Sequence, residues 1–152
     1  MRIQRTNSQN IDFIHLVKAL DAYLKITDKE EHDFYNQFNG IDVLNEVVVV
    51  YKDATKKMHA VGCAAMKKFD ATTVEVKRMY VLPEERGIGI AQKIMQELEN
   101  WAKELNYKKC ILETGKRQVA AVKFYAKCKY QVIENYGQYQ GMQNSICFEK
   151  QL

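Results

Sequence analysis

The stretch from Val74 to Trp101, VEVKRMYVLPEERGIGIAQKIMQELENW, constrains the fold of this chain more than any other. It opens with a β-branched and aromatic run of strand length, residues 74–81. Pro83 ends that strand, because proline cannot donate to a sheet ladder and disfavours helix at the residue before it. From Ile90 to Leu105 the apolar residues recur at helical spacing. The stretch therefore predicts a strand, a short loop and a long amphipathic helix.

The loop between this strand and this helix contains two glycines, Gly87 and Gly89. Glycine allows the backbone to approach a ligand closely, and the first amides of a helix are unpaired donors at the positive end of its dipole. Such a helix start suits phosphate or pyrophosphate. A dinucleotide fingerprint would need a third glycine at position 92, where the chain has Gln92. We therefore predict an anion site of another kind, the alternative being ordinary packing of a strand and a helix.

The spacing Arg86-x-x-Gly89-x-Ala91, after a strand reading KRMYV and a turn proline, resembles the cofactor motif of the GNAT superfamily of N-acetyltransferases. The pattern of that family is Arg/Gln-x-x-Gly-x-Gly/Ala. The resemblance implies acetyl-coenzyme A (acetyl-CoA) as the cosubstrate, with its pyrophosphate at this loop.

A second segment, residues 118–130, is similar to the family pattern Asn-x-x-Ala-x-x-Phe/Leu-Tyr-x-x-x-Gly-Phe/Tyr. Four residues match it: Ala121, Phe124, Tyr125 and Tyr130. Gln118 replaces the asparagine, which weakens the inference of a side-chain contact to pantetheine. Lys129 replaces the glycine, and a lysine disfavours the left-handed conformation that often ends a helix.

Taken in order, the chain predicts a single domain, residues 1–152, of the α/β (α+β) class with the order β-α-α-β-β-β-α-β-α-β-β. The expected strands are 2–6, 47–51, 60–69, 74–81, 109–114, 130–133 and 145–149, and the expected helices are 11–24, 29–38, 90–105 and 118–128. The strand at 109–114 should lie parallel to that at 74–81, because a helix separates them. The resemblance implies a GNAT-like mixed central sheet of about seven strands flanked by four helices, with the two parallel strands splayed around the coenzyme.

The resemblance also implies which residues bind the coenzyme. The backbone amides that would hold the pyrophosphate belong to Gly87, Ile88, Gly89, Ile90, Ala91 and Gln92. Met79 and Val81 would pair their backbones with the pantetheine arm as an added strand does. Arg86 either adds a charge contact or sets the loop, and both roles stay open.

Acetyl transfer also needs proton transfers. Tyr125 is the candidate general acid, since a phenol can donate a proton to the departing thiolate. Glu75 and Glu113 are candidates for the base that takes the proton of the amine, directly or through water. The alternatives are a packing role for Tyr125 and exposed or paired carboxylates on the strands. Lys77 and Arg78 could pair with those carboxylates.

Composition narrows the classes of protein to which this chain can belong. The net charge of +4 is modest and the basic residues are dispersed, so no nucleic-acid partner is predicted. No apolar run approaches the roughly 20 residues that span a bilayer, and the start of the chain lacks the apolar core of a signal peptide. The four cysteines are scattered and far from the histidines, which predicts reduced core thiols, a cytoplasmic protein and no metal.

The hypothesis is therefore an N-acetyltransferase that moves acetyl from acetyl-CoA to a primary amine, a small molecule or a peptide, by direct attack. The acceptor pocket is expected between the two N-terminal helices and the loop at 136–144, where Tyr136 and Tyr139 could stack on the amine. Glu30, Glu31 and Asp33 would favour a cationic amine if they face this pocket, but a solvated helix face explains them better, and none of these residues identifies the amine. One alternative is a non-catalytic acyl-CoA-binding regulatory module on the same fold. A small nucleic-acid-binding protein ranks last. The closing strands leave open whether two copies form a homodimer.

Overall fold

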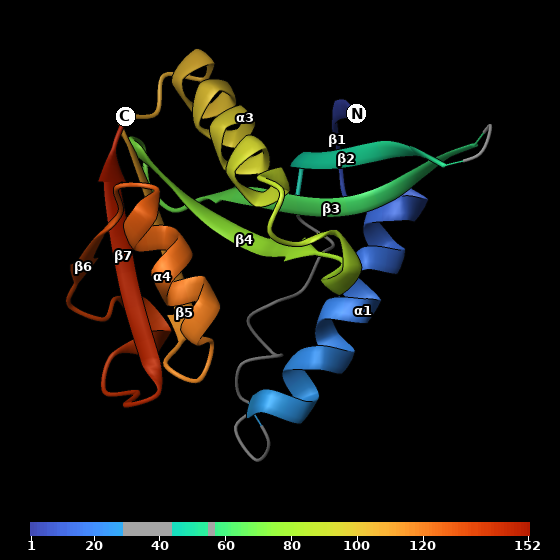
Figure 1. Ribbon diagram of the computed structural model, residues 1–152. Coiled ribbons are helices and arrows are strands. Elements are labelled where there is room, and N and C mark those ends of the chain that lie inside the picture. The colour runs from blue at the N-terminus through green and yellow to red at the C-terminus, as the bar shows by residue number, and fades with distance from the viewer. Residues whose placement is uncertain (29–43, 55–56) are drawn as a thin grey trace.

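The structure is a computed structural model and describes residues 1–28, 44–54 and 57–152 (Figure 1). The strands are β1 (Arg2–Thr6), β2 (Glu46–Ala54), β3 (Lys57–Lys68), β4 (Thr73–Val81), β5 (Lys109–Gly115), β6 (Gln131–Ile133) and β7 (Ser145–Gln151). The α-helices are α1 (Ile11–Asp28), α3 (Ile90–Glu104) and α4 (Val119–Lys127), and the short 3-10 turns are η2 (Pro83–Glu85) and η3 (Gly137–Tyr139).

The seven strands form one sheet in the order β1-β2-β3-β4-β5-β7-β6. Each pair is antiparallel except β4 with β5, which is parallel as the intervening helix predicts. The predicted mixed sheet of seven strands is thus confirmed. Three of the four predicted helices are present, and the fourth, at 29–38, lies outside the described residues.

Helices cover both faces of the sheet and define two cores (Figure 1). On one face α3 and α4 pack against the sheet, and the buried apolar stripe of α3 is Ile90, Ile94, Met95, Leu98 and Ala102. On the other face α1 buries Phe13, Leu16, Val17 and Leu20. This spacing is that of an amphipathic helix with one apolar side. Among the described residues, no helix is long and apolar enough to span a membrane.

β4 and β5 separate soon after they meet. Only Thr73–Glu75 of β4 pair with Lys109–Ile111 of β5. Beyond this point β4 has a bulge, since its register with β3 slips between Ala65↔Lys77 and Cys63↔Tyr80. Arg78, inside the bulge, has a left-handed backbone with φ of 60°. The bulge changes the alternation of side chains, so that Val76 and Met79 both pack toward the core under α3 and α4.

The end of α4 keeps its left-handed residue without a glycine. Lys129 has φ of 75°, and the amides of Lys129 and Tyr130 bond back to Ala126 O (3.1 Å) and Tyr125 O (3.0 Å). The end of the helix therefore keeps its usual left-handed geometry, although Lys129 replaces the glycine of the family pattern. The cost is strain, because a left-handed backbone costs a residue with a Cβ roughly 1–2 kcal/mol.

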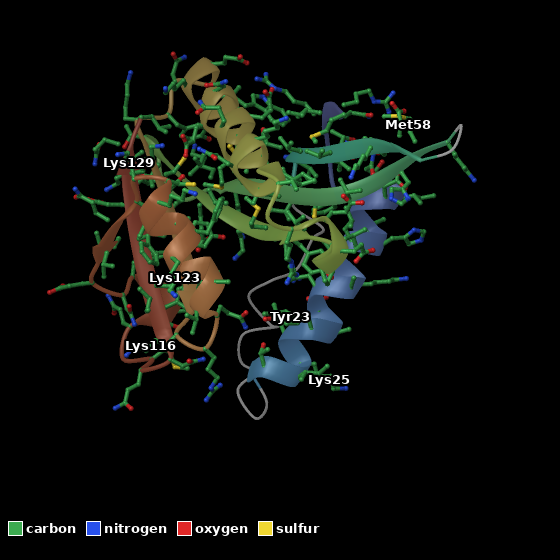
Figure 2. The ribbon with its side chains drawn as sticks, in the orientation of Figure 1. Tyr23, Lys25, Met58, Lys116, Lys123 and Lys129 are labelled. Carbon is green, nitrogen blue, oxygen red and sulfur yellow. The ribbon has the colours of Figure 1, made fainter. Side chains whose placement is uncertain are left out.

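This strain predicts that Lys129→Gly stabilises the protein. The free energy of unfolding in urea should rise by about 1 kcal/mol, the relief of strain minus the extra chain entropy that glycine loses on folding. The matched control is Lys123→Gly, at an exposed position within α4 (both lysines are labelled in Figure 2), which should lower it by about 1 kcal/mol. Equal destabilisation by both substitutions would contradict the assignment of strain to Lys129.

Candidate active site

A cavity of about 420 Å³ lies where β4 and β5 diverge. Its walls come from β4, the end of β5, the first turns of α4 and the second half of α1. Figure 2 shows Tyr23 extending from α1 toward this space, and Tyr23 lines the cavity. Beyond Glu75 the edge of β4 that borders the cavity has no strand partner in the described part of the chain. An unpaired strand edge offers backbone donors and acceptors to an extended ligand. Met79 and Val81 lie on this edge.

A second cavity, of about 230 Å³, adjoins the start of α3. It shares Arg86, Gly87, Ala91 and Phe124 with the first, so the two cavities adjoin, and together they are called the cleft. Gly89 is the N-cap of α3 in a left-handed conformation (φ 87°) and has no capping side chain. The first amides of α3 are therefore uncapped donors that border the cleft. Of the predicted loop residues, Ile88 is exposed and does not line either cavity.

Gly87 contributes to the open shape of this loop. Its φ is 84°, and a Cβ placed on Gly87 or Gly89 would meet nothing within 4 Å. The two positions need glycine for backbone conformation rather than for close packing, and they leave the space above the amides clear. That clearance, together with the uncapped helix start, fits an anionic ligand of pyrophosphate size.

Arg86 turns back onto the protein. Its Nε donates a 2.8 Å hydrogen bond to Val81 O, and its guanidinium lies 5.5 Å from the ring centre of Tyr80 and 5.8 Å from that of Tyr23. Arg86 therefore connects the end of β4 and the end of α1 to the loop. Of the two roles left open by the sequence, this geometry fits the setting of the loop.

Tyr125 projects from α4 into the large cavity, with 7% of its surface exposed. Its ring packs against Phe124, Tyr130 and Phe148, at centroid distances of 5.3, 6.1 and 5.9 Å. Within the described residues its hydroxyl makes no hydrogen bond. Burial raises the pKa of Tyr125 above its ordinary value, and the nearby Cys128 and Glu113 add to the rise. The phenol is consequently a proton donor at neutral pH.

Glu75 lines the cavity at the point on β4 where its pairing with β5 ends, and it is 7% exposed. Oε2 of Glu75 accepts a 2.6 Å hydrogen bond from Tyr136 Oη, and Oε1 lies 3.6 Å from Lys77 Nζ. The predicted pairing of Lys77 with a strand carboxylate is confirmed. Burial lowers the pKa of Lys77, and the charge of Glu75 opposes this. Burial and the charge of Glu75 raise the pKa of Tyr136.

Arg78 has a different partner from the one suggested by the sequence. Its Nη1 is 2.6 Å from Oδ1 of Asp21 on α1, so the bulge is joined to the helix that covers it. The sequence suggested the strand carboxylates as partners because they lie close in sequence. The bulge instead turns Arg78 toward α1, a tertiary effect that no local pattern encodes.

Glu113 lies on β5 and faces the same cavity, half-buried. Oε2 of Glu113 accepts a 2.7 Å hydrogen bond from Ser145 Oγ at the start of β7. Its charge contributes to the raised pKa of Tyr125, which places this carboxylate within electrostatic reach of the phenol. Sequence reasoning missed Ser145. Side chains alternate along β7, so Ser145 and Cys147 share one face of the sheet. Had the register of β7 with β5 been known, this alternation would have placed Ser145 beside Glu113.

Gln118 lines the cavity but is bonded across it. Nε2 of Gln118, at the start of α4, donates a 2.8 Å hydrogen bond to Thr27 Oγ1 near the end of α1. The acidic residues expected at the acceptor pocket, Glu30, Glu31 and Asp33, lie outside the described residues. The structure does bring Tyr136 and Tyr139 to the cavity region, with ring centroids 5.7 Å apart.

Among the described residues no group of three metal-ligating side chains occurs.

Comparison with known proteins agrees with this geometry. Residues 14–130 match the family model of the acetyltransferase (GNAT) family. This match covers most of the chain, which therefore belongs to the GNAT family and to its class of acetyl-CoA-dependent acyltransferases.

Two relatives and two solved structures illustrate the similarity. An IAA acetyltransferase of Azospirillum brasilense is 27% identical over 140 residues, 91% of this chain and 90% of that protein. An uncharacterized N-acetyltransferase of Schizosaccharomyces pombe is 31% identical over 78 residues, 51% of this chain, so the chain matches about half (48%) of that relative.

Among solved structures, a protein of Klebsiella pneumoniae described as an acyl-CoA N-acyltransferase has a TM-score of 0.82 at 27% identity. The match covers 99% of this chain and 97% of that protein chain. The PaiA N-acetyltransferase of Thermoplasma acidophilum, solved in complex with coenzyme A, has a TM-score of 0.70 at 18% identity, covering 99% and 98%. At that identity the second likeness concerns the fold alone.

The contacts of Arg86 predict that lysine cannot replace it. Arg86→Lys keeps the charge but loses the Nε donor and the planar group between the two tyrosines. The free energy of unfolding in urea should fall by roughly 1 kcal/mol in Arg86→Lys and by a similar amount in Arg86→Gln. A lysine variant that matches the wild type while the glutamine variant is destabilised would show that Arg86 acts through its charge.

Proposed function

We propose that this protein is an N-acetyltransferase that transfers the acetyl group of acetyl-CoA to a primary amine by direct attack. One observation carries the proposal: the cleft formed by the two adjoining cavities is bordered by the uncapped start of α3, the unpaired edge of β4 and the buried phenol of Tyr125. The cleft thus offers an anion site, a strand edge and a proton donor.

The chain has residues that fit each part of the coenzyme. Amides of Gly87 to Gln92 would hold the pyrophosphate at the start of α3. The edge of β4 at Met79 and Val81 would pair with the amide-bearing pantetheine arm. Gln118 could contact the same arm only by giving up its bond to Thr27. When bound, the coenzyme supplies an activated acetyl thioester.

Tyr125 is proposed as the general acid. Its raised pKa keeps the phenol protonated at neutral pH, and its hydroxyl is available for the thiolate that leaves. The amide of Met79 would polarise the acetyl carbonyl in the manner of an oxyanion hole.

Glu113 is the better candidate for the base. Its charge contributes to the raised pKa of Tyr125, so it lies within electrostatic reach of the proposed acid. Glu113 would therefore take the proton of the attacking amine, directly or through water.

The acceptor is proposed to be an amine on a small molecule or on a peptide. All four cysteines are free thiols, three of them buried, which fits a reducing compartment such as the cytoplasm.

Ligand-induced stabilisation tests the coenzyme site. Thermal unfolding should be followed with acetyl-CoA, with ADP and with NAD. A ligand that binds only the folded state stabilises it by about 2.7 kcal/mol at 100 times its Kd. We expect a clear upward shift in Tm with acetyl-CoA and little with NAD. No shift at millimolar acetyl-CoA would refute the coenzyme site and the function with it.

Replacement of the phenol separates catalysis from binding. Tyr125→Phe keeps the ring contacts and removes the proton donor, so kcat should fall about 10²-fold or more while the Tm shift with acetyl-CoA persists. The measurement is release of coenzyme A thiol in the presence of a panel of primary amines. Undiminished kcat in the variant would exclude Tyr125 as the acid, and a wild type inactive toward every amine would favour a coenzyme-binding regulatory module.

A further inference from the structure

In the described part of the chain, two carboxylates line the cavity, and each accepts a hydrogen bond from a hydroxyl group of the chain segment between β6 and the start of β7. Tyr136 Oη donates to Glu75 at 2.6 Å, and Ser145 Oγ donates to Glu113 at 2.7 Å. Residues 134–145 are called here the C-terminal arm. The arm therefore supplies one oriented donor to each of the two residues able to act as the base.

The register of β5 with β7 explains why Ser145 reaches Glu113. Glu113 is paired with Cys147, so these two side chains lie on the same face of the sheet. Ser145 precedes Cys147 by two residues and shares that face. Its side chain is buried, at 3% exposed, which means that the hydroxyl has been placed against Glu113 rather than toward solvent.

The backbone around Ser145 is fixed on both sides. Ser145 N bonds to Met142 O at 3.1 Å, and the neighbouring Asn144 O accepts a 2.7 Å bond from Lys116 N, just past the end of β5. Asn135 Nδ2 closes the arm on itself by bonding to Tyr139 O and Met142 O, at 3.1 and 3.0 Å. A donor on a rigid segment holds its acceptor in one orientation, which is what a catalytic base requires.

We propose that Ser145 is a positioning residue that orients the carboxylate of Glu113 as the catalytic base, and that the C-terminal arm is therefore part of the acceptor side of the active site. This inference rests on the acetyl-transfer function proposed above. Through its hydrogen bond to Oε2, Ser145 holds the carboxylate of Glu113 in one orientation on the wall of the cavity. Ser145 itself does not touch the reacting atoms.

The surroundings of Glu113 make a pH measurement interpretable. Among the described residues, the titratable or charged groups that share its cavity or its face of the sheet are Tyr23, Glu75, Lys77, Arg78, Tyr80, Arg86, Tyr125, Tyr139 and Cys147. Burial raises the pKa of Tyr125 and of Tyr139, and it raises the pKa of Cys147 to about 11. Burial lowers the pKa of Lys77, and Glu75 is a second carboxylate, so the signal of Glu113 itself has to be followed.

The primary test is a carboxyl titration by NMR, with the protein labelled with ¹³C at its glutamates and the Glu113 signal assigned through Glu113→Gln. A hydrogen bond donated to a carboxylate favours its charged form. Ser145→Ala should therefore move the midpoint of Glu113 to higher pH, by about half a unit to one unit. Tyr136→Phe, which removes the equivalent donor from Glu75, should leave the midpoint of Glu113 in place. No movement in Ser145→Ala would overturn the proposal.

The kinetic test uses the acceptor that gives the highest turnover in the amine panel. Ser145→Ala should lower kcat/KM about tenfold and move the acidic limb of its pH profile upward together with the Glu113 midpoint. Tyr51→Phe is the matched control, because it removes a 2.8 Å phenol–carboxylate bond to Asp12 outside the cleft and should change neither. An acidic limb that moves with Tyr136→Phe and not with Ser145→Ala would assign the base to Glu75 and overturn the proposal.

Failure of the proposed acetyl transfer and failure of the inference about Ser145 give different experimental results. A wild type that turns over no amine, but whose Glu113 midpoint still rises in Ser145→Ala, would refute acetyl transfer while showing that Ser145 holds Glu113. An active wild type whose Ser145→Ala variant keeps both the midpoint and the acidic limb would refute the inference and leave the acetyltransferase intact.

Discussion

The separation of β4 from β5 is the constraint on which the rest of the site depends. The two parallel strands share three residue pairs, after which the bulge at Lys77 and Arg78 turns β4 away. A sheet with no gap would satisfy its own backbone and leave no edge for a ligand. The bulge creates that edge, and the helix that follows β4 brings its uncapped start to the same cleft. The bulge in β4 thus helps to bring the anion site, the strand edge and the phenol to one cleft.

Charged residues line the cavity between β4 and β5, at buried positions that a stable core would fill with apolar side chains. Lys77 is paired with Glu75, and Arg78 with Asp21, with the lysine, the arginine and the glutamate all largely buried beside the bulge. Buried ion pairs are poor sources of stability, because the loss of solvation offsets most of the attraction. Their location on the walls of the cavity is instead consistent with a polar acceptor site. Hydrogen bonds across the opening, from Gln118 to Thr27 and from Tyr136 to Glu75, connect the two halves of the structure.

Much of this arrangement can be predicted from the sequence, because it is encoded locally. Strand composition, Pro83, the helical period after Ile90 and the Arg86 motif give the order of elements and the position of the coenzyme loop. The partners of the polar side chains cannot be predicted in this way. Ser145 meets Glu113, and Arg78 meets Asp21, only once strand register and the bulge are known. At Lys129 the local sequence predicts the wrong backbone conformation. A lysine disfavours the left-handed conformation, but the burial of the neighbouring Tyr130 imposes it.

Amide hydrogen exchange with and without acetyl-CoA tests the central claim most directly, that the unpaired edge of β4 and the start of α3 form the coenzyme site. Exchange of each backbone amide reports local opening and ligand contact. We expect acetyl-CoA to slow exchange at 79–81 and 87–92, with little change at β1 or β2 on the far side of the sheet. Binding of acetyl-CoA that leaves both segments unprotected, or that protects a different surface, would contradict it.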